Sequence, residues 1–433
     1  MKSVSAFQII VITVFVVLTI AGVGVFAAFG GISGGTSVGA VTIWGTQDAQ
    51  AIDGVLQTLR TNDKSFQEVT YVQADPVKYQ ASLVNAIASG RSPDLFMMSV
   101  EQMGVFADKI ITVPYNKVSQ STYTNSYIDE ANVFLNSAGA WALPFTVDPL
   151  VMYFNRDLLS SAGVSTAPRY WNELLSLAPK ITSLDSSQNV RRSAVALGTW
   201  SNVNNAKAIL SSLFMQAGDP IVGRDEQGNL ASVFGSAPPG AAENPAQSAL
   251  RFYTEFANPS KTSYSWNRSL PTSVQAFVGG DLAIYFGFAS ELGTIAKQNP
   301  NLHFGVALLP QLQGSSVQVT YGLLTGLAIP RSARNPQGAL VIAQKLSSQA
   351  AAQALAVSTG LPPVRRDVAL DTSANAAAQV FVQSGLIARG WFDPNQGATD
   401  GIFKAMIESV TTGKSDPAQA VSDAAQAFTA LFQ

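Results

Sequence analysis

The chain has 433 residues, which is more than one ordinary hydrophobic core accommodates and therefore predicts two or three domains. Its 26 basic and 28 acidic residues give a formal net charge of −2, so it lacks the positive excess that a nucleic-acid partner requires. Cysteine is absent, which excludes disulfides, thiolate nucleophiles, cysteine-ligated metals and a lipid anchor on an N-terminal cysteine.

An uncharged apolar run at residues 7–29 comes first along the chain. Its length matches a bilayer core, and Lys2 before it places that end in the cytoplasm by the positive-inside rule. Val25 and Ala27 also form an acceptable cleavage site, so residues 1–29 are expected to be a transmembrane helix that anchors the chain or a signal segment that is removed. Both alternatives predict export of everything after the Gly/Ser linker at residues 30–40.

Strands and helices alternate in the next part of the chain. Apolar runs at residues 41–44, 69–72 and 94–98 predict strands, and the stretches between them carry apolar residues at helical spacing. Thr46 or Asp48 is expected to cap the first of these helices. This βαβαβ order predicts one half of a doubly wound sheet.

Residues 142–171, ALPFTVDPLVMYFNRDLLSSAGVSTAPRYW, predict a hinge between two domains. Pro144 and Pro149 restrict the backbone on either side of Asp148, and the apolar run that follows has the composition of a buried strand. Asn155 or Asp157 is then expected to cap the following helix, and a second helix is expected to open at Pro168.

The alternation resumes in the second half and gives way to helices near the C-terminus. A long polar insertion rich in Gly, Pro and Ala interrupts it at residues 223–244. The predicted strands are 194–197, 282–286, 304–308 and 322–329, and the predicted helices are 206–216, 245–256, 272–278, 339–346, 348–357, 375–384, 399–411 and 417–432.

The order of these segments resembles that of the family 1 extracellular solute-binding proteins, the maltose-binding-protein-like receptors of ABC transporters. The motifs that carry the resemblance are WGT, PD, LPFTVDPLVMYFNRDLL, GDLAIYFG, FGVALLP and GLAIP, in that order from about residue 41 onward. The resemblance implies an α/β, two-lobed fold of the periplasmic-binding-protein type II, each lobe a doubly wound sheet with flanking helices. Residues 41–146 and 327–364 would form lobe 1, and residues 147–326 and 365–433 would form lobe 2.

Few side chains support an enzymatic reading. His303, the single histidine, lies in a turn-like context, and the GKS string at residues 413–415 lacks the upstream glycine of a phosphate loop. We therefore expect no metal, no cofactor and no catalytic residue. One alternative stays open, a secreted glycoside hydrolase that uses acids such as Asp48, Glu101 and Asp148.

Polar and aromatic residues follow several predicted strands, where open α/β sheets bind their ligands. Aromatic rings pack on the apolar face of a pyranose, and carboxylates, amides and guanidinium groups bind its hydroxyls. Trp171 and Tyr285 are instead predicted to be core residues. The candidate ligand-binding residues are Trp44, Gln47, Asp48, Glu101, Asp148, Trp200, Asn202, Trp266, Phe288, Tyr321, Arg365 and Trp391.

The expected function is that of a membrane-anchored or secreted solute-binding receptor. Its lobes would close on a small molecule, with a carbohydrate favoured, and present it to the permease subunits of an ABC importer. Arg365 and Arg366 leave an anionic ligand open. A two-lobed sensor ectodomain that signals to a membrane partner is a further alternative.

Overall fold

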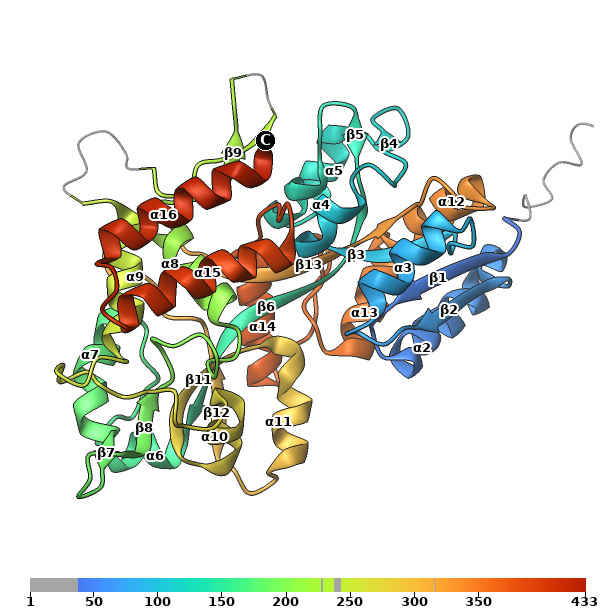
Figure 1. The fold of residues 1–433 in the computed structure, drawn as a ribbon. Coiled ribbons are helices and arrows are strands. Elements are labelled where there is room, and N and C mark those ends of the chain that lie inside the picture. Colours follow the sequence, from blue (N-terminus) through green and yellow to red (C-terminus); the bar gives the residue numbers. More distant parts are fainter. Residues whose placement is uncertain (1–37, 227–228, 237–242, 316) are drawn as a thin grey trace, which may run out of the picture.

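The computed structural model describes residues 38–226, 229–236, 243–315 and 317–433 (Figure 1). The predicted apolar segment at residues 7–29 and most of the linker at residues 30–40 lie outside this part of the chain. Among the helices that are described, none combines the length and hydropathy needed to cross a membrane.

Lobe 1 is built on three parallel strands in the order β2 (Val69–Gln73), β1 (Val41–Gly45) and β3 (Leu95–Ser99). The helix α2 (Ala49–Asn62) connects β1 to β2, and its N-cap is Asp48, whose side chain accepts a hydrogen bond from the Ala51 amide. The helix α3 (Tyr79–Ala88) leads into β3. The predicted βαβαβ half is therefore confirmed.

Two long strands cross between the lobes. The strand β6 (Leu143–Asn155) pairs through its first half with β13 (Thr320–Ala328) and through its second half with β11 (Leu282–Phe288) and β12 (Phe304–Ala307). Because β13 also pairs with β3, the strands of both lobes join in one 10-stranded sheet. The two crossings predicted from the sequence are thus neighbouring antiparallel strands.

Two hydrophobic clusters form the cores of the lobes. The cluster of lobe 1 includes Val147 and Leu324, and the cluster of lobe 2 includes Leu150 and Tyr321, so each crossing strand passes from one core to the other within three residues. Figure 1 shows α12 (Pro336–Leu346) and α13 (Gln349–Thr359) beside the N-terminal elements of lobe 1. The later helices α15 (Gln396–Thr411) and α16 (Pro417–Thr429) cover lobe 2.

Three local expectations differ from the structure. The strand β8 (Val190–Val195) begins four residues before its predicted start and ends before residue 197. The polar insertion contains a hairpin, β9 (Val222–Arg224) with β10 (Leu230–Ser232). The helix α7 (Trp171–Ile181) begins three residues after Pro168, because the Glu173 carboxylate accepts hydrogen bonds from the amides just before Trp171 and fixes the helix start there.

The remaining elements complete the layers around the sheet. The α-helices are α4 (Met103–Phe106), α5 (Gln120–Ser126), α6 (Arg156–Ser161), α8 (Ala206–Ala217), α9 (Pro245–Glu255), α10 (Ser273–Gly279), α11 (Leu292–Gln298) and α14 (Ala376–Leu386). The strands are β4 (Val113–Pro114), β5 (Gly139–Ala140), β7 (Ser183–Leu184) and β14 (Ala388–Arg389). The 3₁₀ helices are η1 (Lys64–Phe66), η2 (Val100–Gln102), η3 (Asp129–Phe134), η4 (Ala289–Glu291) and η5 (Ala430–Phe432).

Candidate functional site

Four of the predicted ligand-binding residues meet where the strands of the two lobes end. Glu101 lies on η2 after β3, Phe288 ends β11, Asp148 lies on β6 at the crossing, and Tyr321 lies at the start of β13. The Tyr321 hydroxyl donates to Glu101 Oε1 at 3.1 Å, and its ring centroid is 6.3 Å from that of Phe288. The Ser290 amide, two residues after Phe288, donates to Asp148 Oδ1 at 3.0 Å. We call Glu101, Asp148, Phe288 and Tyr321 the carboxyl-end cluster.

Glu101 connects the two lobes. Its Oε2 accepts a hydrogen bond of 3.0 Å from the Gln396 amide group at the start of α15. Burial raises the pKa of the Glu101 carboxyl above its usual range, while the nearby charge of Lys207 and the hydrogen bond from Tyr321 act in the opposite direction. Both carboxylate oxygens of Glu101 therefore accept a hydrogen bond, one from each lobe-2 side chain.

Asp148 is also shifted by its surroundings. Burial raises its pKa to about 7, and the carboxylate of Glu291 contributes in the same direction, while hydrogen bonds from Ser290 partly offset both effects. Because the group titrates near neutral pH, it can act as a hydrogen-bond donor or as an acceptor toward a ligand.

Lys207 is a buried cation beside this cluster that the sequence analysis did not select. Its Nζ lies 2.8 Å from Asp393 Oδ2, 2.8 Å from Asp400 Oδ1 and 2.7 Å from Thr399 Oγ1. The side chains of Lys207 and Asp393 are 9% and 1% exposed. The sequence could have indicated this buried cation, because Lys207 is the single charged residue in the helix segment AKAILSSLFMQA and a lysine on a buried helix needs charged partners.

Three candidates lie together at the carboxyl end of β1 in lobe 1. Trp44 and Gln47 are partly buried, and Asp48 is exposed and caps α2. The Gln47 carbonyl accepts a 2.8 Å hydrogen bond from the Tyr71 hydroxyl, which holds this loop against β2. None of the described hydrogen bonds joins these three side chains to the carboxyl-end cluster.

Three further candidates belong to the interior or rim of lobe 2. Trp266 is fully buried, and its Nε1 donates to Asn202 Oδ1 at 3.2 Å. Asn202 is itself 8% exposed, and its amide group donates to the Asn267 and Leu270 carbonyls. Trp200 is partly exposed and packs against the lobe 2 cluster. Trp266 and Asn202 therefore brace the loop that carries Trp200.

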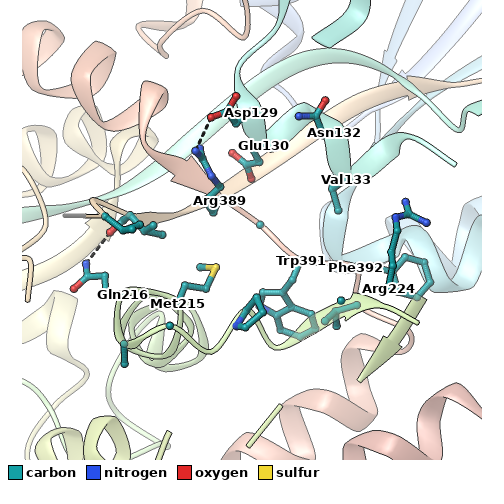
Figure 2. A pocket seen from close by; sticks show the side chains of 18 of the residues that line it. Asp129, Glu130, Asn132, Val133, Met215, Gln216, Arg224, Arg389, Trp391 and Phe392 are labelled. Atoms are coloured by element: carbon teal, nitrogen blue, oxygen red, sulfur yellow. Dashed lines mark hydrogen bonds and ion pairs between the residues drawn. The ribbon is translucent and has the colours of Figure 1, made fainter. Parts of the chain in front are cut away.

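The last two candidates lie apart from the carboxyl-end cluster. Arg365 forms two hydrogen bonds, of 2.8 and 2.7 Å, with the Asp367 carboxylate, and its guanidinium lies 5.1 Å from the centre of the Tyr127 ring. Trp391 is buried against Phe403 and lines a cavity of about 710 Å³ that contains none of the other candidates (Figure 2).

Trp171 and Tyr285 are buried as predicted, and the single histidine, His303, lies at the surface. Trp171 is 2% and Tyr285 is 1% exposed. The side chain of His303 is 73% exposed, and its Nδ1 lies 3.3 Å from the carboxylate of the surface residue Asp157. Within residues 38–433, and apart from the short stretches that are not described, no group of three His, Cys, Asp or Glu side chains has a metal-binding arrangement.

Comparisons with known proteins identify the family. A binding protein of Brucella abortus (strain 2308) is 22% identical over 363 residues, which are 81% of this chain and 82% of that protein. The cyclic alpha-maltosyl-1,6-maltose binding protein of Arthrobacter globiformis superimposes with a TM-score of 0.73 at 17% identity, covering 90% of this chain and 98% of that one.

UgpB of Mycobacterium tuberculosis has the same fold, with a TM-score of 0.69, 18% identity and coverage of 91% of this chain and 98% of its own. These likenesses confirm the two-lobed α/β fold. Residues 61–353 match the family of bacterial extracellular solute-binding proteins, which is the greater part of the chain. The chain therefore belongs to the bacterial extracellular solute-binding proteins.

Proposed function

We propose that this protein is the receptor of an ABC importer and that it binds a carbohydrate between its lobes. The carboxyl-end cluster carries the proposal, because it gathers two carboxyl groups and two aromatic rings at the point where the strands cross. Sugars are recognised by this combination of hydrogen-bonding groups and ring faces. Similarity to the Arthrobacter globiformis protein, whose name states a maltosyl-maltose ligand, supports the same class of solute.

Lobe movement is the mechanism that we infer. The hydrogen bond between Glu101 of lobe 1 and Gln396 of lobe 2 joins the lobes beside the cluster. A bending of β6 and β13 that separates these two side chains would free Glu101 for a ligand, and the ligand would then restore the connection. Trp44, Gln47, Asp48 and Trp200 complete the proposed site at its rim.

A carbohydrate is favoured over an anionic solute by the charge pairing. UgpB, solved in complex with glycerophosphocholine, makes a phosphodiester the second candidate class. In this chain, however, Arg365 is engaged by Asp367 and Lys207 by Asp393 and Asp400. Arg365 and Lys207 are therefore already paired with carboxylates and do not offer a free positive charge to a phosphate. The carboxylates of Glu101 and Asp148 would repel a phosphate group.

The location follows from the family and the N-terminal sequence. An extracellular solute-binding protein acts outside the cytoplasm. We propose that residues 7–29 either hold the protein in the membrane or are removed as a signal segment, and that the permease subunits of the importer are its partners.

The test is a binding titration of the purified chain with maltotetraose, mannotriose, α-D-tagatose and glycerophosphocholine by isothermal titration calorimetry. We expect one of the sugars to bind, and Glu101→Gln to weaken that binding about 10- to 100-fold, because a hydrogen bond to a charged group contributes about 1.5–3 kcal/mol. Glu68→Gln, which makes the same change on an exposed surface, is the control and keeps the affinity.

Two outcomes would contradict the proposal. Binding of glycerophosphocholine with no response to any sugar would assign the phosphodiester class instead. Release of shorter sugars from maltotetraose during the titration would show glycoside hydrolysis and make the cluster an active site.

A further inference from the structure

A buried carboxyl group lies against the places where the chain passes between the lobes. Glu130, on η3 of lobe 1, is 2% exposed, and among the described residues neither of its carboxylate oxygens has a hydrogen-bond partner. A Cβ added to Gly322 would overlap its Oε2, and a Cβ added to Gly390 would lie 2.8 Å from its Oε1. The two glycines therefore form a slot that fits the carboxyl without satisfying it.

The first glycine marks the crossing made by β13. Gly322 lies between Tyr321, which packs in the core of lobe 2, and Leu324, which packs in the core of lobe 1. Consecutive residues of a strand point to opposite faces. Tyr321 directs its hydroxyl to Glu101, whereas Gly322 faces Glu130, so the slot is on the face of β13 opposite to the carboxyl-end cluster.

The second glycine marks another crossing. Gly390 lies between Ala388, which belongs to the core of lobe 1, and Trp391, which belongs to the core of lobe 2. A Cβ added to Gly390 would also lie 3.2 Å from the Gly322 carbonyl, so the two crossings run side by side. Glu130 thus contacts two of the connections about which the lobes can move relative to each other.

The positive charges near this slot are paired with another carboxylate. Arg389 donates to Asp129 Oδ2 at 2.7 Å and to the Ala388 carbonyl at 2.7 Å. Arg366 pairs with the same aspartate. The ionisable groups around Glu130 are Asp129 on η3, Tyr321 on β13, Arg389 on β14, Glu101 on η2, Arg366, and Arg224 of the β9–β10 hairpin. No described hydrogen bond joins any of them to the Glu130 carboxyl.

The slot suits the neutral form of Glu130. Burial raises the pKa of its carboxyl to about 8, and the charge of Arg389 and the Leu324 amide offset this effect only in part. An ionised carboxylate in the same place would be desolvated without a donor, which is costly enough to make a group change its protonation or its position.

A cavity beside the slot offers room for such a change of position. Glu130 lines the cavity of about 710 Å³, and Figure 2 shows Arg389 and Asp129 beside it and Met215 and Trp391 on the other side. Glu130 belongs to lobe 1, whereas Met215 on α8 packs against the core of lobe 2. The cavity therefore has walls from both lobes, and a change in their separation alters the space around the carboxyl.

We propose that Glu130 is a proton-operated switch between two arrangements of the lobes. The neutral carboxyl stabilises the arrangement described above, in which it fills the slot between Gly322 and Gly390. The ionised carboxylate favours an arrangement in which η3 shifts relative to these two crossings. The slot then opens toward the cavity, and water and the Arg389 guanidinium reach the carboxylate oxygens.

The direction of the pH dependence follows from proton binding. The described arrangement holds the Glu130 proton with a pKa of about 8, whereas a hydrated glutamate has its ordinary pKa of 4.5. The described arrangement is therefore favoured at low pH and loses this advantage as pH rises from about 4.5 to 8. With these two values, the ratio of the shifted to the described arrangement rises about 70-fold between pH 6.0 and 8.5.

The test measures the distance between two spin labels, one on each lobe, by double electron–electron resonance on the full chain without sugar. Because the sequence contains no cysteine, Ser82→Cys on α3 and Ser160→Cys on α6 provide two exposed attachment sites. We expect a second population in the distance distribution, whose ratio to the first rises about 70-fold from pH 6.0 to 8.5.

Three variants of the labelled chain locate the source of the shift. Glu130→Gln keeps the shape of the side chain but cannot ionise, so it should show the pH 6.0 distribution at both pH values. Asp148→Asn should keep the shift, although burial places the pKa of that carboxyl at about 7 and it lies on the other crossing strand, β6. Glu68→Gln makes the same change as Glu130→Gln on an exposed surface and should also keep the shift.

An identical distance distribution at the two pH values in the labelled parent chain would overturn the proposal. A shift that Glu130→Gln retains, or that Asp148→Asn removes, would overturn it as well. Because no sugar is present, these outcomes are independent of whether the protein transports a carbohydrate.

Discussion

Replacement of Lys207 by Met tests whether the buried cation holds lobe 2 together beside the carboxyl-end cluster. Lys207 Nζ is 2.8 Å from both Asp393 and Asp400, but these two carboxylates differ in exposure, with side chains that are 1% and 42% exposed. Lys207→Met therefore leaves one fully buried carboxylate, Asp393, without a counter-charge. The Thr399 hydroxyl, at 2.8 Å, is then the remaining side-chain donor among those described.

The magnitude follows from this difference in exposure. Removing one partner of a buried ion pair costs about 3–5 kcal/mol of unfolding free energy, because the other charge stays buried and unpaired. The pair with Asp400 is partly exposed and contributes at most about 1 kcal/mol. We therefore expect Lys207→Met to lower the unfolding free energy by about 3–5 kcal/mol and Asp400→Asn to lower it by less than about 1 kcal/mol.

Urea unfolding at pH 7, followed by tryptophan fluorescence, measures both values. The double variant Lys207→Met with Asp393→Asn removes the buried charge together with its partner, so it should be more stable than Lys207→Met alone. A double variant no more stable than the single one would refute the reasoning, since the loss would then come from packing of the lysine chain and not from the unpaired carboxylate.

The other predictions concern the two faces of β13. Burial raises the pKa of Glu130 in the folded protein to about 8, above that of a solvated glutamate, so the stability of the wild type falls as pH rises from about 4.5 to 8. Glu130→Gln should remove this fall. In urea titrations it should be about 2–4 kcal/mol more stable than the wild type at pH 8.5 and differ little from it at pH 4.5. Gly322→Ala should lower the unfolding free energy by about 1–3 kcal/mol because the new Cβ would meet the Glu130 carboxylate. Gly401→Ala, in an open position of α15, should raise it by about 0.5–1 kcal/mol. Equal effects of the two variants in thermal unfolding would contradict this. Phe288→Ala should reduce sugar affinity about tenfold with the far-ultraviolet circular dichroism unchanged, and unchanged affinity would remove the ring from the proposed site.

The alternation of strands and helices was readable from the sequence because periodicity and capping are local properties. Of the two caps that the sequence offered at each helix start, Thr46 or Asp48 and Asn155 or Asp157, the structure has Asp48 and Asn155. The hairpin in the polar insertion was missed because its strands are only three residues long and carry no alternating apolar pattern.

Burial of individual aromatic residues was harder to predict. The polar residues around Trp266 indicated an exposed turn. In the structure the neighbouring Ser265 hydroxyl is buried and accepts hydrogen bonds from the Ala194 and Val195 amides, at 3.0 and 3.1 Å. Serine and asparagine can therefore occupy a buried segment when backbone groups satisfy them.

The buried charges depend on contacts between distant parts of the chain. Lys207 and Asp393 are 186 residues apart, and Glu130 faces Gly322 across a comparable separation. No local pattern encodes such a pairing. The carboxyl-end cluster was accessible to prediction only because the strand ends that carry it share one edge of the sheet by the rule for open α/β folds.

The discontinuous course of the chain also governs the order in which its parts can fold during synthesis. The core of lobe 1 contains residues from Val41 to Val147, but it also requires Leu346, Leu355 and Val364. Lobe 2 has its own core residues between these two sets. A nascent chain therefore makes the central portion of lobe 2 before the last pieces of lobe 1 leave the ribosome. The N-terminal part of the lobe 1 core, up to Val147, waits in an incomplete state while about half of the chain is made.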